Sequence, residues 1–342
     1  MKLKLDEEEF KRATELVNKS IELEESESPP ELITKLIAEE IKKFQNELLA
    51  KRNIKTKAPK QWITPIDKVS NNAFNGKGTL YKENGANVRL SGRKSKKEIL
   101  SFVRLDYSDN AIQISGKKEL TQYDREVHDA LVTLYIDGGN EYITPQMIYR
   151  TMTGNPEAKL PPKQREDISS SLDKLMYSKL VIKASDAECK AYGIDKWTYE
   201  ETVIQGRKST VIMKGEVIET YHLRSEPALY TYAKFKNQIC RLDIKLLNSP
   251  VSKNEENITL QGYLLRRINS IKRGKLSPTI LYERIYKQLD IQASSDGALR
   301  KKKLKVRNTV KKILDYLKAH DFIKNYTENS DGQEVTGITI SY

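Results

Sequence analysis

The feature that most limits how this chain can fold is an internal repeat of a helix start. The segment ITPQMIYRTM at 143–152 matches LSPTILYERI at 276–285, 133 positions later. In each copy a hydroxyl residue, Thr144 or Ser277, stands directly before a proline. Serine and threonine are favoured at the cap of a helix, and proline at its first position. The repeat therefore predicts the same helix twice, in two copies of one fold.

A second match continues the repeat in the same order. Leu172-Asp173-Lys174-Leu175 matches Leu314-Asp315-Tyr316-Leu317, now 142 positions later. The spacing grows from 133 to 142, which predicts nine more residues between these helices in the second copy, at 290–299. A shared packing pattern would also arise in a duplicated domain that binds nothing. The repeat thus predicts architecture before function.

Helix and strand signals alternate around the first copy. Thr121 is the predicted cap of a helix, with Asp124 at the third helical position in an acidic form of the capping box. The expected elements are helices from Thr121 to Gly138, Thr144 to Gly154 and Lys163 to Ser178, and strands at 141–143 and 180–182. Helix, strand, helix, helix, strand is the order of a winged helix, whose last strands form a hairpin called the wing.

The first wing is predicted to be an enlarged sheet, because strand-like segments continue at 197–205, 209–213 and 217–223. The stretch Gly206-Arg207-Lys208-Ser209 is expected to be a basic turn at a strand tip. Wing tips often meet the phosphate backbone of DNA, so Arg207 and Lys208 are candidate phosphate contacts. A plain solvated hairpin is the alternative.

Residues 299–323 are predicted to be a long helix with one buried face, because their apolar residues follow helical spacing. The buried face is formed by Val306, Val310, Ile313, Leu314 and Leu317. The opposite face is formed by Lys301, Lys305, Asn308, Lys312 and Asp315, with Lys311 on the flank. Strands at 322–323 and 335–342, joined by a turn at 328–332, would complete a second winged helix.

This helix carries nine basic residues and one acidic residue between Arg300 and Lys318. The DNA major groove admits an α-helix, so a packed, strongly basic helix is a candidate for insertion there. A solvated charged face is the alternative. The expected phosphate contacts are Lys163, Arg207, Lys208, Arg300, Lys301, Lys302, Lys303 and Lys311. The expected base contacts are Lys305, Asn308 and Lys312 on this helix, and Ser170, Lys174 and Tyr177 on the helix at 163–178.

The overall charge points to a polyanionic partner. With 60 basic and 47 acidic residues, the formal net charge is +13, which favours nucleic acid first and an anionic membrane surface second. No apolar run is long enough to span a bilayer, and the first residues lack the apolar core of a signal peptide. Cys189 and Cys240 form no CxxC motif, which predicts a reducing cytoplasm and no structural zinc site.

We therefore predict an α+β chain with two winged-helix domains in tandem, the first with an enlarged β wing. Residues 1–55 are expected to form a helical accessory or oligomerising segment, with a loosely attached arm as the alternative. Residues 56–250 are expected to be the first domain, with a β-rich lead-in over 78–114 that pairs with a later sheet. The basic run at 93–97 is interpreted as a surface turn, with phosphate contact as the alternative. Residues 251–342 are expected to be the second domain.

Signatures of catalysis are scarce. No GxxxxGK[ST] phosphate-binding loop occurs, and the three histidines, His128, His222 and His320, are scattered. The sequence has no HxH or HExxH pair to bind a metal. A rolling-circle nickase would need clustered histidines near a catalytic tyrosine. We therefore expect no catalytic residues, no metal and no cofactor.

Several separated blocks resemble one known family. They are ELTQYDREVHDAL, NEYITPQMIYRTMTGNPEAKL, LNSPVSKNEENITLQGYLLRRI and IYKQLDIQASSDGALRKKKLKVRNTVKKILDYLK. From about Trp62 to the C-terminus the chain resembles replication initiator proteins (RepA-like) of plasmids and integrative elements of Gram-positive bacteria. Their tandem winged-helix plan is similar to that of the iteron-binding plasmid initiators.

The resemblance implies recognition of double-stranded DNA at origin repeats, with two winged helices on successive grooves. It further implies opening of the nearby duplex, recruitment of host helicase or initiator proteins, and autorepression as a homodimer. The location it implies is the cytoplasm, with the plasmid or nucleoid and without a membrane partner. Two other functions stay open: a transcriptional regulator of the same architecture and, less favoured, a DNA-nicking relaxase.

Overall fold

The computed structural model describes part of the chain. The described residues are 58–74, 79–81, 87–88, 103–107, 112–116, 120–183, 190, 193, 195, 198–213, 216–293, 295–332 and 334–342. The chain divides between Lys57 and Ala58, and every described residue lies in the part from 58 to 342. The predicted helices in residues 1–55, the basic run at 93–97 and Cys189 lie outside the described residues. Among the helices described, none is long and apolar enough to cross a membrane.

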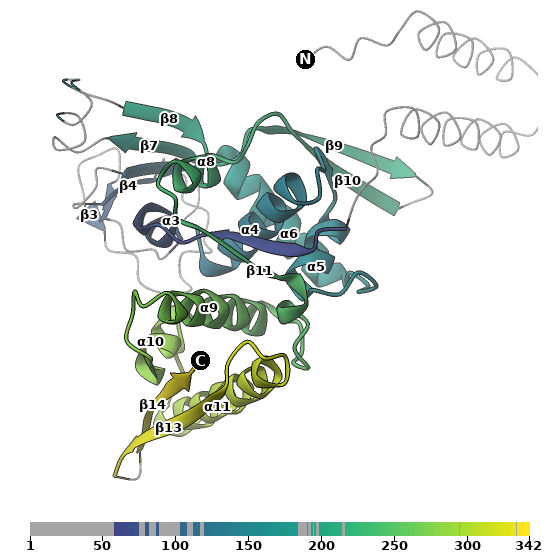
Figure 1. Cartoon of the computed structure of the whole chain (residues 1–342). Coiled ribbons are helices and arrows are strands. Elements are labelled where there is room, and N and C mark those ends of the chain that lie inside the picture. The colour runs from purple at the N-terminus through teal and green to yellow at the C-terminus, as the bar shows by residue number, and fades with distance from the viewer. Residues whose placement is uncertain are drawn as a thin grey trace, which may run out of the picture. The chain divides into compact units, whose positions relative to one another are not determined.

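The first module, residues 120–223, contains three helices and a three-stranded antiparallel sheet (Figure 1). Its elements are α4 (Gln122–Ile136), β6 (Tyr142–Ile143), α5 (Pro145–Thr153), α6 (Pro162–Tyr177), β9 (Gly206–Met213) and β10 (Glu216–Leu223). The sheet order is β6-β10-β9. The reciprocal capping box of Thr121 and Asp124 is present at α4, as predicted. Thr144 caps α5, and Gly154 ends it in a left-handed conformation, with a φ of 62°.

The second module, residues 255–342, repeats this order of elements (Figure 1). Its elements are α9 (Glu255–Lys272), β12 (Thr279–Leu281), α10 (Tyr282–Gln288), α11 (Asp296–Ala319), β13 (Asn325–Asp331) and β14 (Glu334–Ser341). The sheet order is β12-β14-β13, so in both modules the short first strand pairs with the last strand of the hairpin. Leu172 of α6 and Leu314 of α11 are both fully buried, so the predicted match between these two helices is confirmed.

A separate six-stranded sheet corrects the predicted first wing. Its order is β3-β2-β4-β5-β7-β8. The strands are β2 (Thr79–Tyr81), β3 (Asn87–Val88), β4 (Val103–Tyr107), β5 (Ile112–Gly116), β7 (Lys179–Lys183) and β8 (Thr198–Thr202). The lead-in pairs with a later sheet as predicted, because β5 pairs with β7. A single enlarged wing was the wrong prediction: β7 and β8 continue the lead-in sheet, whereas β10 pairs with β6 and β9 in a separate sheet.

A short ribbon and its neighbours connect the two modules. β1 (Gln61–Pro65) pairs with β11 (Ile239–Asp243) along five residues. α3 (Lys68–Ala73) follows β1, α8 (Ala228–Phe235) precedes β11, and the 3₁₀ turn η2 (Ile244–Leu247) leads from β11 toward α9. β1 is fixed to α4 because Ile63 N donates to Thr133 Oγ1 over 2.8 Å. The first strand described therefore packs beside the connection between modules.

Each module has its own hydrophobic core. In the first, side chains of α4, α5, α6 and β10 meet, among them Leu131, Ile148, Leu172 and Tyr221. In the second, α9, α10, α11 and β14 contribute Leu264, Ile285, Leu314 and Ile338. Burial of such side chains stabilises by roughly 1.5–3 kcal/mol each. The two long helices α6 and α11 are thereby held with one face inward.

The register of the repeat differs from the prediction by four residues. Ser277 does not cap a helix, because β12 follows it and α10 begins only at Tyr282, without a side-chain cap. The positions that correspond are buried isoleucines: Ile143 and Ile280 in the strands, Ile148 and Ile285 in the helices. Both pairs lie 137 positions apart, not 133. The hydroxyl-proline match therefore does not mark equivalent positions in the two modules, and the buried core residues define the repeat.

The C-terminal hairpin also begins later than predicted. Phe322 and Ile323 precede the strand, and β13 runs through Asp331, so most of the predicted turn at 328–332 is strand. Gly332, with a φ of 57°, lies in the actual turn. Polar residues are tolerated in β13 because it is an edge strand that pairs only with β14.

Candidate nucleic-acid interface

α11 is the best-defined element of the candidate interface. Ser295 caps it by accepting from Ala298 N, and Asp296 lies in its first turn, where a carboxylate favours the helix dipole. Five apolar residues are buried along one stripe, as predicted: Val306, Val310, Ile313, Leu314 and Leu317. Lys318 lies in the last turn, so both ends of the helix carry a charge that interacts favourably with the helix dipole.

The opposite face of α11 is exposed and basic. Lys301, Lys305, Asn308, Lys312 and Asp315 are all exposed, as the helical spacing predicted. Arg300, Lys301, Lys305 and Lys312 form no ion pair within the described part of the chain. Asp315, the acidic residue on this face, accepts a hydrogen bond from Tyr326 Oη over 2.8 Å. Three lysines and one amide therefore face solvent from one side of a single helix, and Arg300 lies on its flank, turned about 100° from Lys301.

The remaining predicted contacts on α11 have partners in the module. Lys302 Nζ donates to the Gln292 carbonyl over 3.2 Å, and Lys303 Nζ lies 5.3 Å from the centre of the Tyr286 ring. Lys311 Nζ is 2.8 Å from Glu328 Oε2, with 42% of the lysine side chain exposed. An exposed pair of this kind contributes at most about 1 kcal/mol, so a phosphate can replace the carboxylate.

The first turns of α11 extend beyond the module core. No residue from Asp296 to Lys305 is buried. Because Leu172 corresponds to Leu314, the first residue of α6, Pro162, corresponds to Leu304. α11 thus begins eight residues earlier than α6, an extension of about 12 Å at 1.5 Å per residue. The predicted longer connection at 290–299 is wrong: residues 289–295 connect α10 to α11, seven residues against the eight of 154–161 between α5 and α6, and residues 296–299 form helix.

Sequence reasoning missed Leu304 within this extension. Its side chain is 50% exposed although apolar, and it lies between Lys303 and Lys305. Leucine lies outside the buried stripe when the helix is drawn at 100° per residue, which was the available signal. An exposed apolar group among lysines suits contact with a thymine methyl in the major groove.

α6 occupies the corresponding place in the first module, but its cations are paired. Lys163 Nζ lies 2.8 Å from Asp167 Oδ1, and this hydrogen bond raises the pKa of Lys163. Lys174 Nζ contacts Asp124, and only 19% of the lysine side chain is exposed. The prediction that Lys174 faces solvent is wrong, because the N-terminal turn of α4 lies against it. Ser170 is exposed, and Tyr177 is 76% exposed.

Arg207 and Lys208 do not lie in a turn at a strand tip, which corrects that prediction. Gly206–Ser209 begins β9 and pairs with Thr220–Leu223, so it lies at the end of the hairpin away from the β9–β10 connection. Lys208 Nζ is 2.7 Å from Glu219 Oε1 and 3.0 Å from Asp173 Oδ2. Burial alone would lower the pKa of Lys208, but hydrogen bonds to Glu219 and Asp173 raise it. Arg207 is exposed.

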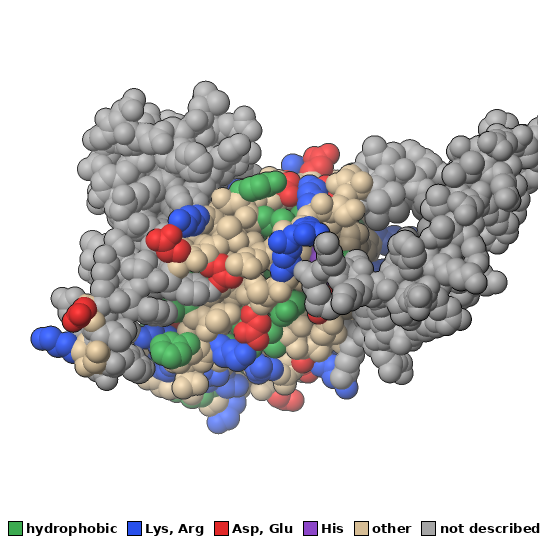
Figure 2. All heavy atoms as spheres, turned by 90° about the horizontal axis from the view of Figure 1, so that it is seen from above, with side chains coloured by type: hydrophobic (Ala, Val, Ile, Leu, Met, Phe, Trp, Pro, Cys, Tyr) green, Lys and Arg blue, Asp and Glu red, His purple; other side chains and the backbone are tan. Residues whose placement is uncertain are grey.

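The charge of the two helices differs accordingly. α6 contains three basic and three acidic residues, whereas α11 contains nine basic and two acidic residues. Figure 2 shows the face that lies uppermost in Figure 1, at the end away from α11, and acidic and basic side chains are interspersed there. The candidate nucleic-acid interface is therefore centred on α11.

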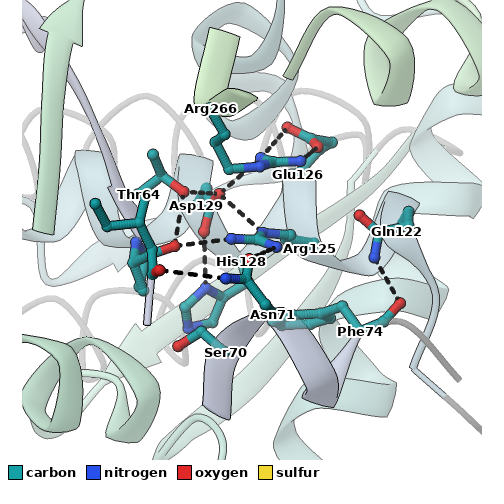
Figure 3. Close-up of polar contacts among 12 residues, drawn as sticks. Thr64, Ser70, Asn71, Phe74, Gln122, Arg125, Glu126, His128, Asp129 and Arg266 are labelled. Atoms are coloured by element: carbon teal, nitrogen blue, oxygen red, sulfur yellow. Dashed lines mark hydrogen bonds and ion pairs between the residues drawn. The ribbon is translucent and has the colours of Figure 1, made fainter. Parts of the chain in front are cut away.

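Sequence reasoning also missed a buried charged cluster between α4 and α9. Arg125, Glu126 and Asp129 of α4 and Arg266 of α9 are at most 6% exposed (Figure 3). Burial lowers the pKa of Arg125 to about 10 and raises that of Glu126. The available signal was the placement of charges beside core residues: Glu126 precedes Val127, and Arg266 follows Leu264-Leu265.

Comparison with known proteins gives distant structural matches. A structure of domains 2–3 of RctB is 13% identical, covers 74% of this chain and 95% of that one, and has a TM-score of 0.40. A second structure of RctB domains 2 and 3 is 11% identical, covers 73% of this chain and 92% of that one, and has a TM-score of 0.38. The structure of the Pi initiator protein in complex with iteron DNA is 12% identical, covers 66% of this chain and 92% of that one, and has a TM-score of 0.35. Scores this low do not establish a shared fold. No protein-family model and no curated protein matches the chain.

Proposed function

We propose that this chain is a sequence-specific duplex-DNA-binding protein of the winged-helix class. In this proposal the two modules are winged helices in tandem, and α11 is the main recognition helix. The observation that carries the proposal is the exposed basic face of α11, with Arg300, Lys301, Lys305 and Lys312 unpaired among the described residues. Such a face costs stability through like-charge repulsion, which a polyanion would relieve.

The contacts divide by chemistry. Arg300 and Lys301, in the extension of α11, are placed to meet phosphates, which position a protein without reading sequence. Lys305, Asn308 and Lys312 recur at intervals of three and four residues along one face, the spacing that follows a groove floor. Asparagine can pair with adenine and lysine with guanine, each good contact giving roughly 1–3 kcal/mol of discrimination.

The first module contributes little charge in this proposal. Ser170 and Tyr177 of α6 and Arg207 of β9 are exposed, whereas Lys163, Lys174 and Lys208 have carboxylate partners. We assign Lys163 and Lys208 only minor phosphate contact and remove Lys174 from base readout. The module adds shape and a few polar contacts to a site held mainly by α11.

We propose replication initiation at a plasmid or mobile-element origin as the biological role. Its support is the sequence resemblance of residues 62–342 to plasmid initiators, together with the paired modules. Origin repeats, a host helicase or initiator protein, and a homodimer are the expected partners, in the cytoplasm. No enzymatic activity is proposed, so the purified protein should not nick supercoiled DNA with or without divalent metal.

The test is a footprint of the purified protein on DNA flanking its own gene, with salt titrated. Protection of a repeated site over about two helical turns is expected, since major grooves recur about 34–36 Å apart along one face. Each phosphate contact should contribute about −0.9 to the slope of log K against log salt. Diffuse protection of any sequence would contradict the proposal, and protection without opening of the flanking duplex would favour a transcriptional regulator.

Lys312→Ala separates base readout from charge within that experiment. If Lys312 reads a base, the variant should change which base is preferred at one position of the site. A uniform loss over all sequences would make Lys312 a phosphate contact instead.

A further inference from the structure

The two modules meet through their first helices, and at one point a carboxylate of one helix lies directly against a glycine of the other. Gly262 of α9 faces Glu126 of α4, and a Cβ on Gly262 would stand 2.0 Å from Glu126 Oε2. No side chain other than hydrogen fits there without movement of the carboxylate. The contact between α4 and α9 therefore requires a glycine at position 262.

One arginine crosses this contact in a fixed geometry (Figure 3). Arg266 Nη2 donates to Glu126 Oε1 over 2.5 Å, and Arg266 Nη1 donates to Glu126 Oε2 over 3.2 Å. The same Nη1 lies 3.1 Å from Asp129 Oδ2. A guanidinium that binds a carboxylate with two parallel hydrogen bonds fixes both distance and orientation.

The cluster is tied to the connecting ribbon as well. Thr64 Oγ1 of β1 donates to Asp129 Oδ2 over 2.5 Å. Arg125 donates from Nη2 to the Pro65 carbonyl over 2.8 Å and from Nη1 to Asn71 Oδ1 over 2.7 Å. Arg266 Cζ lies 5.6 Å from the centre of the Trp62 ring. Two arginines and two carboxylates balance in charge, so the buried cluster is neutral as a whole.

Such a cluster contributes geometry more than stability. Desolvation of buried charges offsets most of their attraction, and apolar residues of similar volume often stabilise a fold as well. What an apolar patch does not supply is a single relative position of two helices, because apolar contacts can slide. A bidentate pair with a third hydrogen bond adds directional contacts that favour one relative position.

Each helix of the contact is joined to one of the two helices of the proposed interface. α4 is joined to α6 by the pair of Asp124 with Lys174 and by the hydrogen bond from Ser171 Oγ to Asp124. α9 and α11 share the core of the second module, through Leu264, Leu265 and Leu314. A fixed position of α4 on α9 therefore fixes α6 relative to α11.

We propose that the cluster of Arg125, Glu126, Asp129 and Arg266, which we call the spacing clamp, makes the protein bind only DNA sites in which the two contacted segments have one spacing. The inference rests on the proposed function. In the duplex, each inserted base pair moves and rotates one segment relative to the other, with 10–10.5 base pairs to a full turn. A rigid pair of modules cannot follow that change, whereas loosely joined modules can.

The experiment uses the full chain and the site found by footprinting. Dissociation constants are measured for the native site and for sites with one or two base pairs inserted between the protected segments. The wild type should bind the sites with an insertion about tenfold more weakly than the native site, which is the effect of losing one bidentate base contact. The variant Arg266→Met/Glu126→Gln removes the bidentate pair and leaves Arg125 and Asp129, 3.8 Å apart, as a balanced buried pair, so its loss of affinity should fall below about threefold.

A second variant and a control guard against a folding defect. Gly262→Ala keeps all charges but displaces the Glu126 carboxylate, which the added methyl would overlap, and it should reduce the spacing penalty in the same way. Lys272→Met alters an exposed lysine of the same helix, bonded to the Phe322 carbonyl within the second module, and should keep the wild-type penalty.

The outcomes separate this inference from the proposed function. If the wild type protects its site but tolerates insertions, the spacing clamp is wrong and the DNA-binding function stands. Folded clamp variants that keep the full insertion penalty also overturn the inference. If the wild type protects no specific site, the proposed function fails, and the inference fails with it.

Discussion

α6 and α11 hold the same place in their modules, yet they use their cations in opposite ways. In the first module Lys163, Lys174 and Lys208 are paired with carboxylates of the same module. In the second, Lys301, Lys305 and Lys312 face solvent without an ion pair among the described residues. A lysine whose charge is already neutralised has little to gain from a phosphate. Counting basic residues in a sequence therefore overstates the DNA affinity of α6 and not that of α11.

The largest expected effect separates basic residues of α11 from paired lysines of the first module. Arg300→Ala/Lys301→Ala/Lys302→Ala removes three expected phosphate contacts of α11 that have no carboxylate partner among the described residues. It should weaken duplex binding on the order of 100-fold at physiological salt and reduce the salt slope by about 2.7. The matched triple Lys163→Ala/Lys179→Ala/Lys208→Ala removes three paired lysines and should change the slope by less than about 1. Fluorescence anisotropy over a salt series measures both slopes. Equal changes in the two triples would erase the difference between the modules.

The buried stripe and exposed face of α11 could be predicted because both depend on helical spacing within one segment. The five apolar residues of the stripe are buried, and the five polar residues of the opposite face are exposed, as that spacing requires. The capping box at Thr121 is equally local, since its partners are three residues apart. These two patterns could be predicted because their physical cause lies within a few residues, whereas the equally short hydroxyl-proline pattern at Ser277 did not mark a helix start.

The partners of Lys174 and Lys208 could not be predicted, because they come from other segments, whereas the partner of Lys163 lies only four residues away on the same helix. Asp124 lies 50 positions from Lys174, and Glu126 lies 140 positions from Arg266. The helical spacing of α6 says which way Lys174 points but not which element covers it. The sheet to which β7 and β8 belong could not be predicted for the same reason, because β7 pairs with β5 of the lead-in.

Lys174 should matter for folding rather than for DNA. Lys174→Met leaves Asp124, which is 1% exposed, without its cation, and we expect a loss of about 2–3 kcal/mol in the free energy of unfolding. Lys312→Met, on the exposed face of α11, should change that free energy by less than about 0.5 kcal/mol while weakening DNA binding. Urea unfolding at neutral pH measures both values. A stable Lys174→Met variant with impaired DNA binding would return Lys174 to the interface.

Base readout should also be unequal between the helices. Asn308→Ala should remove about 1–2 kcal/mol of discrimination at one base position, because asparagine makes a bidentate contact with adenine. Ser170→Ala on α6 should change discrimination by less than about 0.5 kcal/mol, since a serine hydroxyl accepts several bases. Binding to a panel of singly substituted sites measures both. A larger effect at Ser170 would reverse the assignment of the main recognition helix to α11.

The smallest expected effect tests whether an ion pair within the protein prevents a lysine from contributing to DNA affinity. Asp173→Asn/Glu219→Gln removes the two carboxylates that raise the pKa of Lys208 and releases its ammonium group. We expect about threefold tighter binding and a salt slope steeper by about 0.9, the contribution of one phosphate contact. Adding Lys208→Gln to that variant should abolish the increase in slope and so exclude a general effect of the two lost acids. If the steeper slope persists without Lys208, the first module gains affinity through its net charge alone, and ion pairing would not explain why α6 and α11 differ.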